Sequence, residues 1–199
     1  MSFDPADRAQ LPFLDALEGL AHVFLEEALA LPDAAFLPLP DAAANTQGRW
    51  EVCLLKLDLY ADDFPQALLQ DNRVRCPQTW AAIAGLAGLT VAGFMRLAPG
   101  SEIKPHRDRR EDDVIRVHVG LQLPEHERSY WPEGTARLMD IRQLHAARNP
   151  SAQDRLTLCC DFRLGVPVPE GALPPWSPEL PPEPPRRDRA AEAKAEAKA

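Results

Sequence analysis

The pattern of apolar positions divides the chain into a helical N-terminal part and a longer part made of short strands. Between Leu14 and Leu29, apolar side chains recur at three- and four-residue intervals, which is the spacing of one helix face, and Pro32 follows the last of them. We therefore expect a helix over about residues 11–31. A second, shorter helix is expected over about residues 77–86, where Pro77 opens the segment, Gly85 lies in the last turn and Gly88 lies just beyond it.

After these helices, apolar residues alternate or run together in short segments that Gly and Pro turns separate. Five segments have this form, at 51–57, 89–97, 114–123, 136–141 and 155–162. Short strands at such spacing indicate an all-β sandwich or jelly roll, here with the N-terminal helices packed outside. The fold class is therefore predicted to be mainly β.

The strand 114–123 has two different faces. The odd-numbered positions from Ile115 to Leu123 are all apolar and must form the packed face, because alternate side chains on a strand share one side. Arg116, His118 and Gly120 then share the other face. A solvated sheet face would explain this, but the strongly apolar flanks favour the lining of a polar cavity.

Composition changes near the C-terminus, where nine of the 21 prolines lie between Gly165 and Pro185. Proline lacks the backbone donor that helices and central strands need. We expect one globular domain over residues 1–164, followed by a Pro-rich arm and a low-complexity tail over residues 165–199. With 199 residues and 45% hydrophobic side chains, the chain is long enough for one real core.

Charge and cysteine content narrow the class of protein further. The net charge of −8 and pI near 5.1 argue against a general nucleic-acid binder, which needs a basic face. No apolar run has the length of a membrane span, and the polar N-terminus does not have the form of a secretory signal, so a cytoplasmic location is expected. The four cysteines have no zinc-type spacing and are expected to be reduced core residues.

The candidate chemistry centres on two histidines and a carboxylate. His106 and Asp108 stand two positions apart, so on extended backbone their side chains point to the same side. His145 follows the predicted strand at 136–141. Two histidines and one carboxylate form the ligand set of non-haem Fe(II) sites, with open positions on the opposite side of the ion. Each element alone is a weak signal, and an isolated histidine is more often a surface residue.

Arg155 adds weight to this candidate site because it opens an otherwise apolar strand. A strand-edge surface cation would be the ordinary explanation. An arginine on the inner face instead needs an anionic partner, and its planar fork suits a carboxylate in two-point contact. A dicarboxylate co-substrate would supply that carboxylate.

Several blocks of the chain, in this order and spacing, resemble the aspartyl/asparaginyl β-hydroxylase family of 2-oxoglutarate-dependent dioxygenases. The resemblance runs from about Arg49 to Phe162. It is carried by the blocks CPQTW, FMRLAPGSEIKPHRD, RVHVGLQLP, WPEGTARLMD and LHAARNPSAQDRLTLCCDF. It implies a double-stranded β-helix, the cupin-like form of the jelly roll.

The resemblance also implies a role for each matched residue. His106, Asp108 and His145 would bind Fe(II) as the catalytic metal ligands. Arg155 would hold the distal carboxylate of 2-oxoglutarate. Arg116 and His118 would lie near the carboxylate end that chelates the iron. With O2 as oxidant, the implied reaction hydroxylates an unactivated C–H bond of an amino acid or peptide side chain and releases succinate and CO2.

Two positions depart from the family pattern. Met95 stands where the animal enzyme has a serine that assists the co-substrate, and Val114 stands where it has an arginine that holds an acidic substrate. Val114 therefore argues against recognition of an Asp side chain. The arginines at 107, 109 and 110 could face an anionic substrate, although a charged solvated loop is the simpler interpretation.

Three functions are compatible with these residues. The first is hydroxylation of an amino acid, either as a free small-molecule substrate or within a peptide. The second is hydroxylation of a lipid acyl chain, as in bacterial relatives. The third, from a different class, is a non-catalytic, cupin-like metal-binding module.

Overall fold

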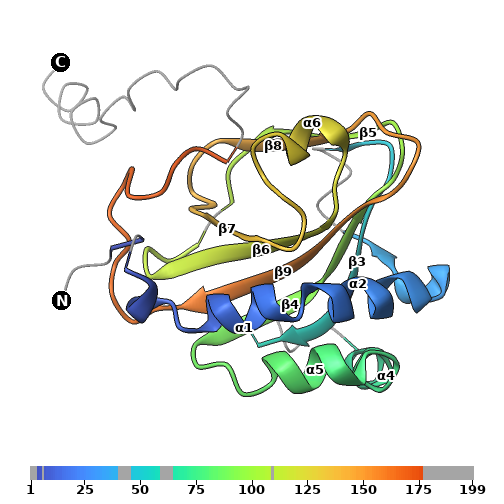
Figure 1. The fold of residues 1–199 in the computed structure, drawn as a ribbon, viewed down its shortest axis with the longest axis horizontal. Coiled ribbons are helices and arrows are strands. Elements are labelled where there is room, and N and C mark those ends of the chain that lie inside the picture. The colour runs from blue at the N-terminus through green and yellow to red at the C-terminus, as the bar shows by residue number, and fades with distance from the viewer. Residues whose placement is uncertain (1–3, 6, 40–45, 59–64, 109, 177–199) are drawn as a thin grey trace, which may run out of the picture.

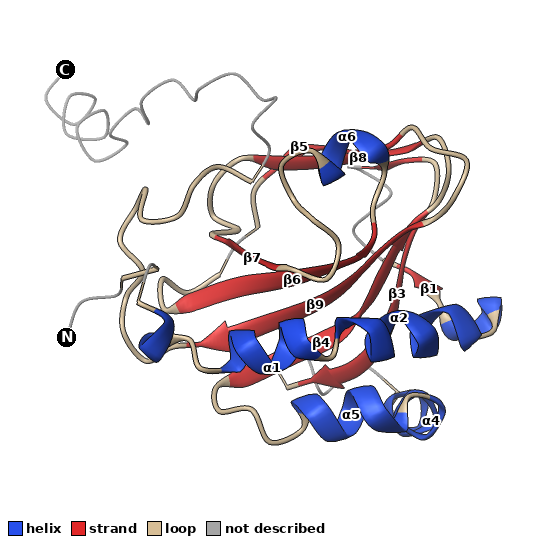
Figure 2. Cartoon of the chain, viewed as in Figure 1, coloured by secondary structure: helices blue, strands red, loops and turns tan. Residues whose placement is uncertain are grey.

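The computed structural model describes residues 4–5, 7–39, 46–58, 65–108 and 110–176, whose strands form two antiparallel sheets (Figures 1 and 2). The larger sheet has the order β1 (Leu37–Pro38), β3 (Trp50–Leu57), β4 (Leu89–Leu97), β9 (Arg155–Arg163), β6 (Val114–Gln122), β7 (Ala136–Met139). The smaller sheet has the order β2 (Thr46–Gln47), β5 (Ser101–His106), β8 (His145–Asn149). The expected mainly β, double-stranded β-helix fold with outer helices is confirmed.

The N-terminal apolar face is carried by two helices rather than one. α1 (Phe13–Gly19) and α2 (Ala21–Ala30) are separated at Leu20, whose ψ of 10° leaves the helical range. The glycine at the end of α1 has a poor helix propensity, which favours a break at this point. Short 3-10 turns precede α1 at Arg8–Gln10 and follow α2 at Asp33–Ala35.

Two further helices, α4 (Gln66–Arg75) and α5 (Pro77–Ile83), pack against each other, and α4 also packs against β3. α5 is the expected second helix and ends earlier than residue 86. α4 was not expected from the sequence. It is mostly polar, and its Asn72 and Arg73 side chains donate to the carbonyls of Leu54 and Leu55 at 2.8 and 2.7 Å. These carbonyls lie at a register shift of β3, where the pairing with β4 is interrupted.

The core lies between these helices and the larger sheet (Figure 1). Phe24 of α2 is fully buried, and Phe13 of α1 stacks on Phe162 of β9 with ring centroids 3.8 Å apart. From β6, Ile115, Val117 and Val119 join this core. The expected packed face of β6 is therefore present.

The opposite face of β6 looks toward the smaller sheet. Arg116 and His118 are buried there and line a cavity between the sheets. Leu123 belongs to a second apolar cluster on this side, because the register of β6 shifts between Gly120 and Gln122. A polar cavity lining, rather than a solvated sheet face, is what the structure has.

The first part of the Pro-rich arm packs against the domain as far as Trp176. Val168, Leu173 and Trp176 are buried, and side-chain donors hold the arm's backbone. Arg142 donates to the Val168 carbonyl at 2.8 Å, and Arg137 donates to the Pro175 carbonyl at 3.1 Å. The remaining residues of the expected tail, 177–199, lie outside the described residues.

Two other expectations concern the core and the membrane. All four cysteines are free and buried, as expected. Among the helices that the structure describes, none combines the length and apolar character that crossing a bilayer requires.

Candidate metal centre

The structure brings His106, Asp108 and His145 together between the two sheets. Their ligand atoms all lie within 4.8 Å of one another. His106 ends β5, His145 begins β8, and the two residues are direct partners in the register of these strands. Asp108 follows β5, and its backbone N–H donates to the Ile141 carbonyl at 2.9 Å. The histidine rings lie 4.2 Å apart between centroids.

An irregularity of β5 directs His106 toward this point. The pairing of β5 with β8 shifts between Ile103 and His106, and Pro105, which has no backbone donor, lies within the shifted segment. A bulge of this kind changes the direction of the following side chain. His106 thereby faces His145 across the strands.

Hydrogen bonds to the backbone fix the state of both imidazoles. Nδ1 of His106 lies 2.9 Å from the Lys104 carbonyl, and Nδ1 of His145 lies 2.9 Å from the Gln143 carbonyl. A carbonyl only accepts, so each Nδ1 carries the proton and each Nε2 offers a lone pair. Burial, followed by the effects of His106 and Arg116, lowers the pKa of His145 to about 4. In the neutral form of each ring, Nε2 is therefore the atom that can bind a metal ion.

The carboxylate of Asp108 is held from one side by Arg116. Oδ1 of Asp108 lies 3.7 Å from Nε2 of His106, while Oδ2 accepts from Nη1 of Arg116 at 3.1 Å. The donor set of two imidazole nitrogens and one carboxylate oxygen fits a divalent metal such as Fe(II). All three side chains also have an outer hydrogen-bond partner, as metal ligands in proteins usually do.

Arg116 itself is buried in an ion pair that the sequence analysis did not foresee. Its Nε and Nη2 donate to the two carboxylate oxygens of Asp161 at 2.6 and 2.9 Å, directly across the β6–β9 pair. Burial would lower the pKa of Arg116, but Asp161 and Asp108 raise it well above its ordinary value. Asp161 and Arg155 are separated by an even number of positions on β9, so their side chains share its inner face. This spacing could be read from the sequence.

His118 lines the same cavity. Its Nδ1 is 3.0 Å from the Thr157 hydroxyl, and its ring centroid lies 4.9 Å from that of Trp176. Burial, together with Arg116 and Arg155, lowers the pKa of His118 well below its ordinary value. The ring is therefore neutral and offers Nε2 for a hydrogen bond.

Arg155 is buried at the start of β9 and pairs with Glu127 of α6 (Glu125–Arg128). The sequence did not indicate Glu127 as a site residue. Nε of Arg155 donates to both carboxylate oxygens, at 2.9 and 3.1 Å. Its Nη2 is buried and has no partner within the described residues. The guanidinium lies 5.6 Å from the Trp131 ring. One side of the guanidinium is thus engaged, and Nη2 remains available for an anion.

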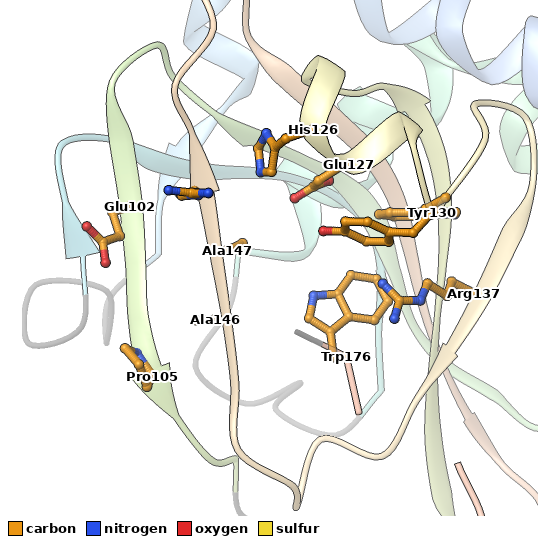
Figure 3. Close-up of a pocket in the computed structure, with 11 residues that line it drawn as sticks. Glu102, Pro105, His126, Glu127, Tyr130, Arg137, Ala146, Ala147 and Trp176 are labelled. Atoms are coloured by element: carbon orange, nitrogen blue, oxygen red, sulfur yellow. The ribbon is translucent and has the colours of Figure 1, made fainter. Parts of the chain in front are cut away.

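The triad cavity, which is lined by His106 and His145 but not by Asp108, is small, with a volume of about 40 Å³. Its walls include the apolar side chains Trp50, Met95, Leu97, Ile103, Met139 and Trp176. A larger recess of about 220 Å³ is also lined by Trp176, and none of the triad residues lines it. In Figure 3, Glu127, Tyr130 and Trp176 stand on one side of this recess, and Ala146 and Ala147 of β8 face them. Both cavities share Trp176 and the two alanines.

The structure locates the two residues that depart from the family pattern and two of the three loop arginines. Val114 is buried at the start of β6 and Met95 lines the triad cavity. Of the three loop arginines, Arg107 donates to the Arg142 carbonyl, and Nε of Arg110 lies 3.9 Å from Asp161. Arg109 is outside the described residues.

Comparison with known proteins finds similar proteins by sequence and by structure. A 2-hydroxylase of the ester-linked acyl chain of ornithine lipid from Rhizobium tropici is 34% identical over 103 aligned positions. That alignment covers 47% of this chain and 36% of the relative, so this chain spans only about a third of that protein. Among solved structures, a Pseudomonas putida prolyl-4-hydroxylase has a TM-score of 0.40 and 16% identity, over 75% of this chain and 86% of that one. A predicted oxalate decarboxylase from Thermotoga maritima has a TM-score of 0.36 and 12% identity, over 64% and 91%.

The family comparison covers most of the domain. Residues 21–164 match the model of the aspartyl/asparaginyl beta-hydroxylase family. This segment contains the three triad residues and the arginines that face them. The chain therefore belongs to the aspartyl/asparaginyl β-hydroxylase family.

Proposed function

We propose that this protein is an Fe(II)- and 2-oxoglutarate-dependent dioxygenase that hydroxylates an unactivated C–H bond. The observation that carries the proposal is the convergence of His106, Asp108 and His145, with both histidines held as Nδ1–H tautomers. Nε2 of His106 lies 3.7 Å from Oδ1 of Asp108, and one ligand atom of each of the three side chains lies within 4.8 Å of the others. Membership of a hydroxylase family supports the same reaction class.

In this proposal the three triad side chains hold the metal from one side. Bound Fe(II), with 2-oxoglutarate and O2, supplies the oxidising chemistry, and the co-substrate leaves as succinate and CO2. The protein's own contribution is to orient the reactants and to exclude water from the cavity. The apolar walls around the triad serve the second purpose.

Arg155 is proposed to anchor the distal carboxylate of 2-oxoglutarate. Its unpartnered Nη2 lies in a residue that is only 5% exposed and that lines the triad cavity. A buried guanidinium N–H without an acceptor is costly, and a ligand carboxylate would remove that cost. Glu127 engages Nε and leaves this part of the fork open.

His118 is proposed to contact the end of the co-substrate near the metal. It is neutral, and Thr157 holds its Nδ1. Nε2 is then left for a ligand oxygen or for water. Arg116 was expected to share this role, but its nitrogens already donate to Asp161 and Asp108.

Two substrate classes remain, and both place an aliphatic carbon beside the triad. An amino acid or peptide side chain is the class to which the family name points. A lipid acyl chain is favoured by the apolar cavity walls and by the name of the Rhizobium relative. Val114 cannot form the ion pair that an acidic side chain would need. Losing such a contact costs about 1.5–3 kcal/mol, so we do not expect Asp as the preferred substrate.

The test is release of succinate from 2-oxoglutarate by the Fe(II)-loaded protein. The substrate panel contains Asp and Asn peptides, free amino acids including proline, and hydroxyacyl lipids. Arg155→Ala should raise the 2-oxoglutarate requirement, and Lys should rescue it only in part because it lacks the planar fork. Arg163→Ala, on the exposed end of the same strand, is the matched control. Metal binding without succinate release under any condition would instead support the non-catalytic metal-binding module.

A further inference from the structure

Asp161 is a fully buried carboxylate that the proposed reaction does not use. It lies on β9 with 0% exposure, between the apolar side chains of a strand that is buried over almost its whole length. A buried charge is retained only when it is paired and hydrogen-bonded. Its partner is Arg116, which donates to both of its oxygens.

Arg116 divides its donors between two carboxylates. Nε and Nη2 bind Asp161, and Nη1 binds Oδ2 of Asp108. The bidentate contact fixes the plane of the guanidinium, and the plane in turn fixes the direction in which Nη1 points. Asp108 is therefore held by a rigid chain of contacts that starts on β9.

This arrangement leaves only one oxygen of Asp108 for the metal. Oδ2 is occupied by Arg116, while Oδ1 faces Nε2 of His106. A carboxylate held in this way binds a metal through one oxygen, so it does not occupy a second coordination position. Asp108 itself lies in an irregular segment after β5, where the backbone alone would not fix its side chain.

The charges of this group balance without a ligand. Asp108 and Asp161 supply two negative charges, and Arg116 and Arg110 supply two positive ones, with Nε of Arg110 lying 3.9 Å from Asp161. Without Asp161, the full positive charge of Arg116 would be directed at Asp108 alone. That would draw electron density from the metal-binding carboxylate and would repel a cation.

We propose that Asp161 and Arg116 are positioning residues that hold Asp108 as a one-oxygen metal ligand. The inference rests on the proposed metal site, and it changes the role of Arg116 from co-substrate binding to ligand orientation. Outer hydrogen-bond partners of metal ligands typically change metal affinity by about 10–100-fold when they are removed. The effect should appear in metal binding itself, before any co-substrate is added.

The experiment measures anaerobic binding of Fe(II), and of Co(II) as a spectroscopic substitute, to the full chain without 2-oxoglutarate. Asp161→Asn keeps the shape of the side chain and removes its charge. Arg116→Lys keeps a charge but cannot contact both carboxylates through a planar fork. We expect both variants to bind metal about 10–100-fold more weakly than the wild type.

Glu51→Gln is the matched control. Glu51 forms another buried pair with Arg96, at 2.9 Å on the same larger sheet, and neither residue lines the triad cavity. This variant should bind metal as the wild type does. Melting curves of each variant separate loss of folding from loss of affinity, and Arg116→Lys keeps the test open if Asp161→Asn does not fold.

The outcomes are separable. If the wild type binds metal and both folded variants bind it equally well, the positioning role is wrong and the proposed function stands. If the wild type binds neither metal, the proposed function itself is wrong, and the positioning role with it. Equal weakening in Glu51→Gln would show a general effect of charge loss and would also overturn the positioning role.

Discussion

The pair of Glu127 and Arg155 is expected to be strongly coupled, because both side chains are almost completely buried. Their exposures are 4% and 5%, and the Nε to oxygen distances are 2.9 and 3.1 Å. Removing one partner of such a pair leaves an uncompensated buried charge and typically costs about 3–5 kcal/mol. Glu127→Leu and Arg155→Met should each lower the free energy of unfolding by about this amount.

The double variant should recover most of that loss. Replacement of a buried pair by apolar residues of similar volume is often neutral or stabilising. Methionine also keeps an unbranched stem near the Trp131 ring, over which the arginine now lies. For a domain of this size each kcal/mol shifts the melting temperature by roughly 2–4 °C, so each single variant should melt at least about 6 °C lower.

The assay is urea and thermal unfolding of the wild type, both single variants and the double variant, without metal or co-substrate. An exposed pair, Arg163 and Glu111 at 3.4 Å, is the control, and its removal should cost no more than about 1 kcal/mol. The reasoning is refuted if either single variant at the buried pair loses as little as the control. It is also refuted if the losses of the single variants simply add in the double variant.

Three further results are expected. Because the pKa of His145 is about 4 in the folded protein and about 6.5 in the unfolded chain, the unfolded chain binds more protons between these values. The free energy of unfolding of the metal-free protein should thus fall as the pH falls from about 6.5 to 4. Urea titrations of His145→Asn should show a smaller fall over the same pH range. An equal dependence on pH in the variant and the wild type would contradict this. Gly93→Ala should destabilise the protein by about 1–3 kcal/mol, because an added Cβ would lie 2.6 Å from the Cys53 carbonyl oxygen on the neighbouring strand. Gly85→Ala is the control, because a Cβ added there has no neighbouring atom within 4 Å. Equal melting temperatures of the two variants would show that the strands can separate at no cost. Finally, burial raises the pKa of the thiols of Cys53, Cys76 and Cys159 to about 12, so a thiol reagent should react with the four cysteines only after unfolding.

The long apolar strands were predictable because their pattern is strong. β4 has the bounds that the sequence predicts, and β6 and β9 differ by one residue each. β5 and β8 were not predicted, because Ser101–His106 is mostly polar and contains Pro105, and His145–Asn149 has no large apolar residue. These two strands are held by pairing with each other and by the cavity they line, which local pattern does not reveal.

Site residues could be predicted where their sequence pattern was distinctive, and were missed where it was not. The spacing of His106, Asp108 and His145 indicated a ligand set, and the structure brings the three together. Glu127 was missed because a four-residue charged helix has the appearance of a solvated turn. The buried position of Trp176 was missed for a similar reason, since a proline-rich segment gives no periodic signal of what it packs against.

The stacking of Phe13 on Phe162 has a consequence for dissection of the protein. Phe162 belongs to a central strand of the larger sheet, and its ring is covered by a residue that precedes the segment matched by the family model. Leu11, Leu14 and Leu17 are buried beside it, while Val168 and Leu173 are buried beyond the other boundary. An excised fragment of residues 21–164 would expose these apolar surfaces to water. The segment that matches the family model is therefore shorter than the segment that packs as one folded unit.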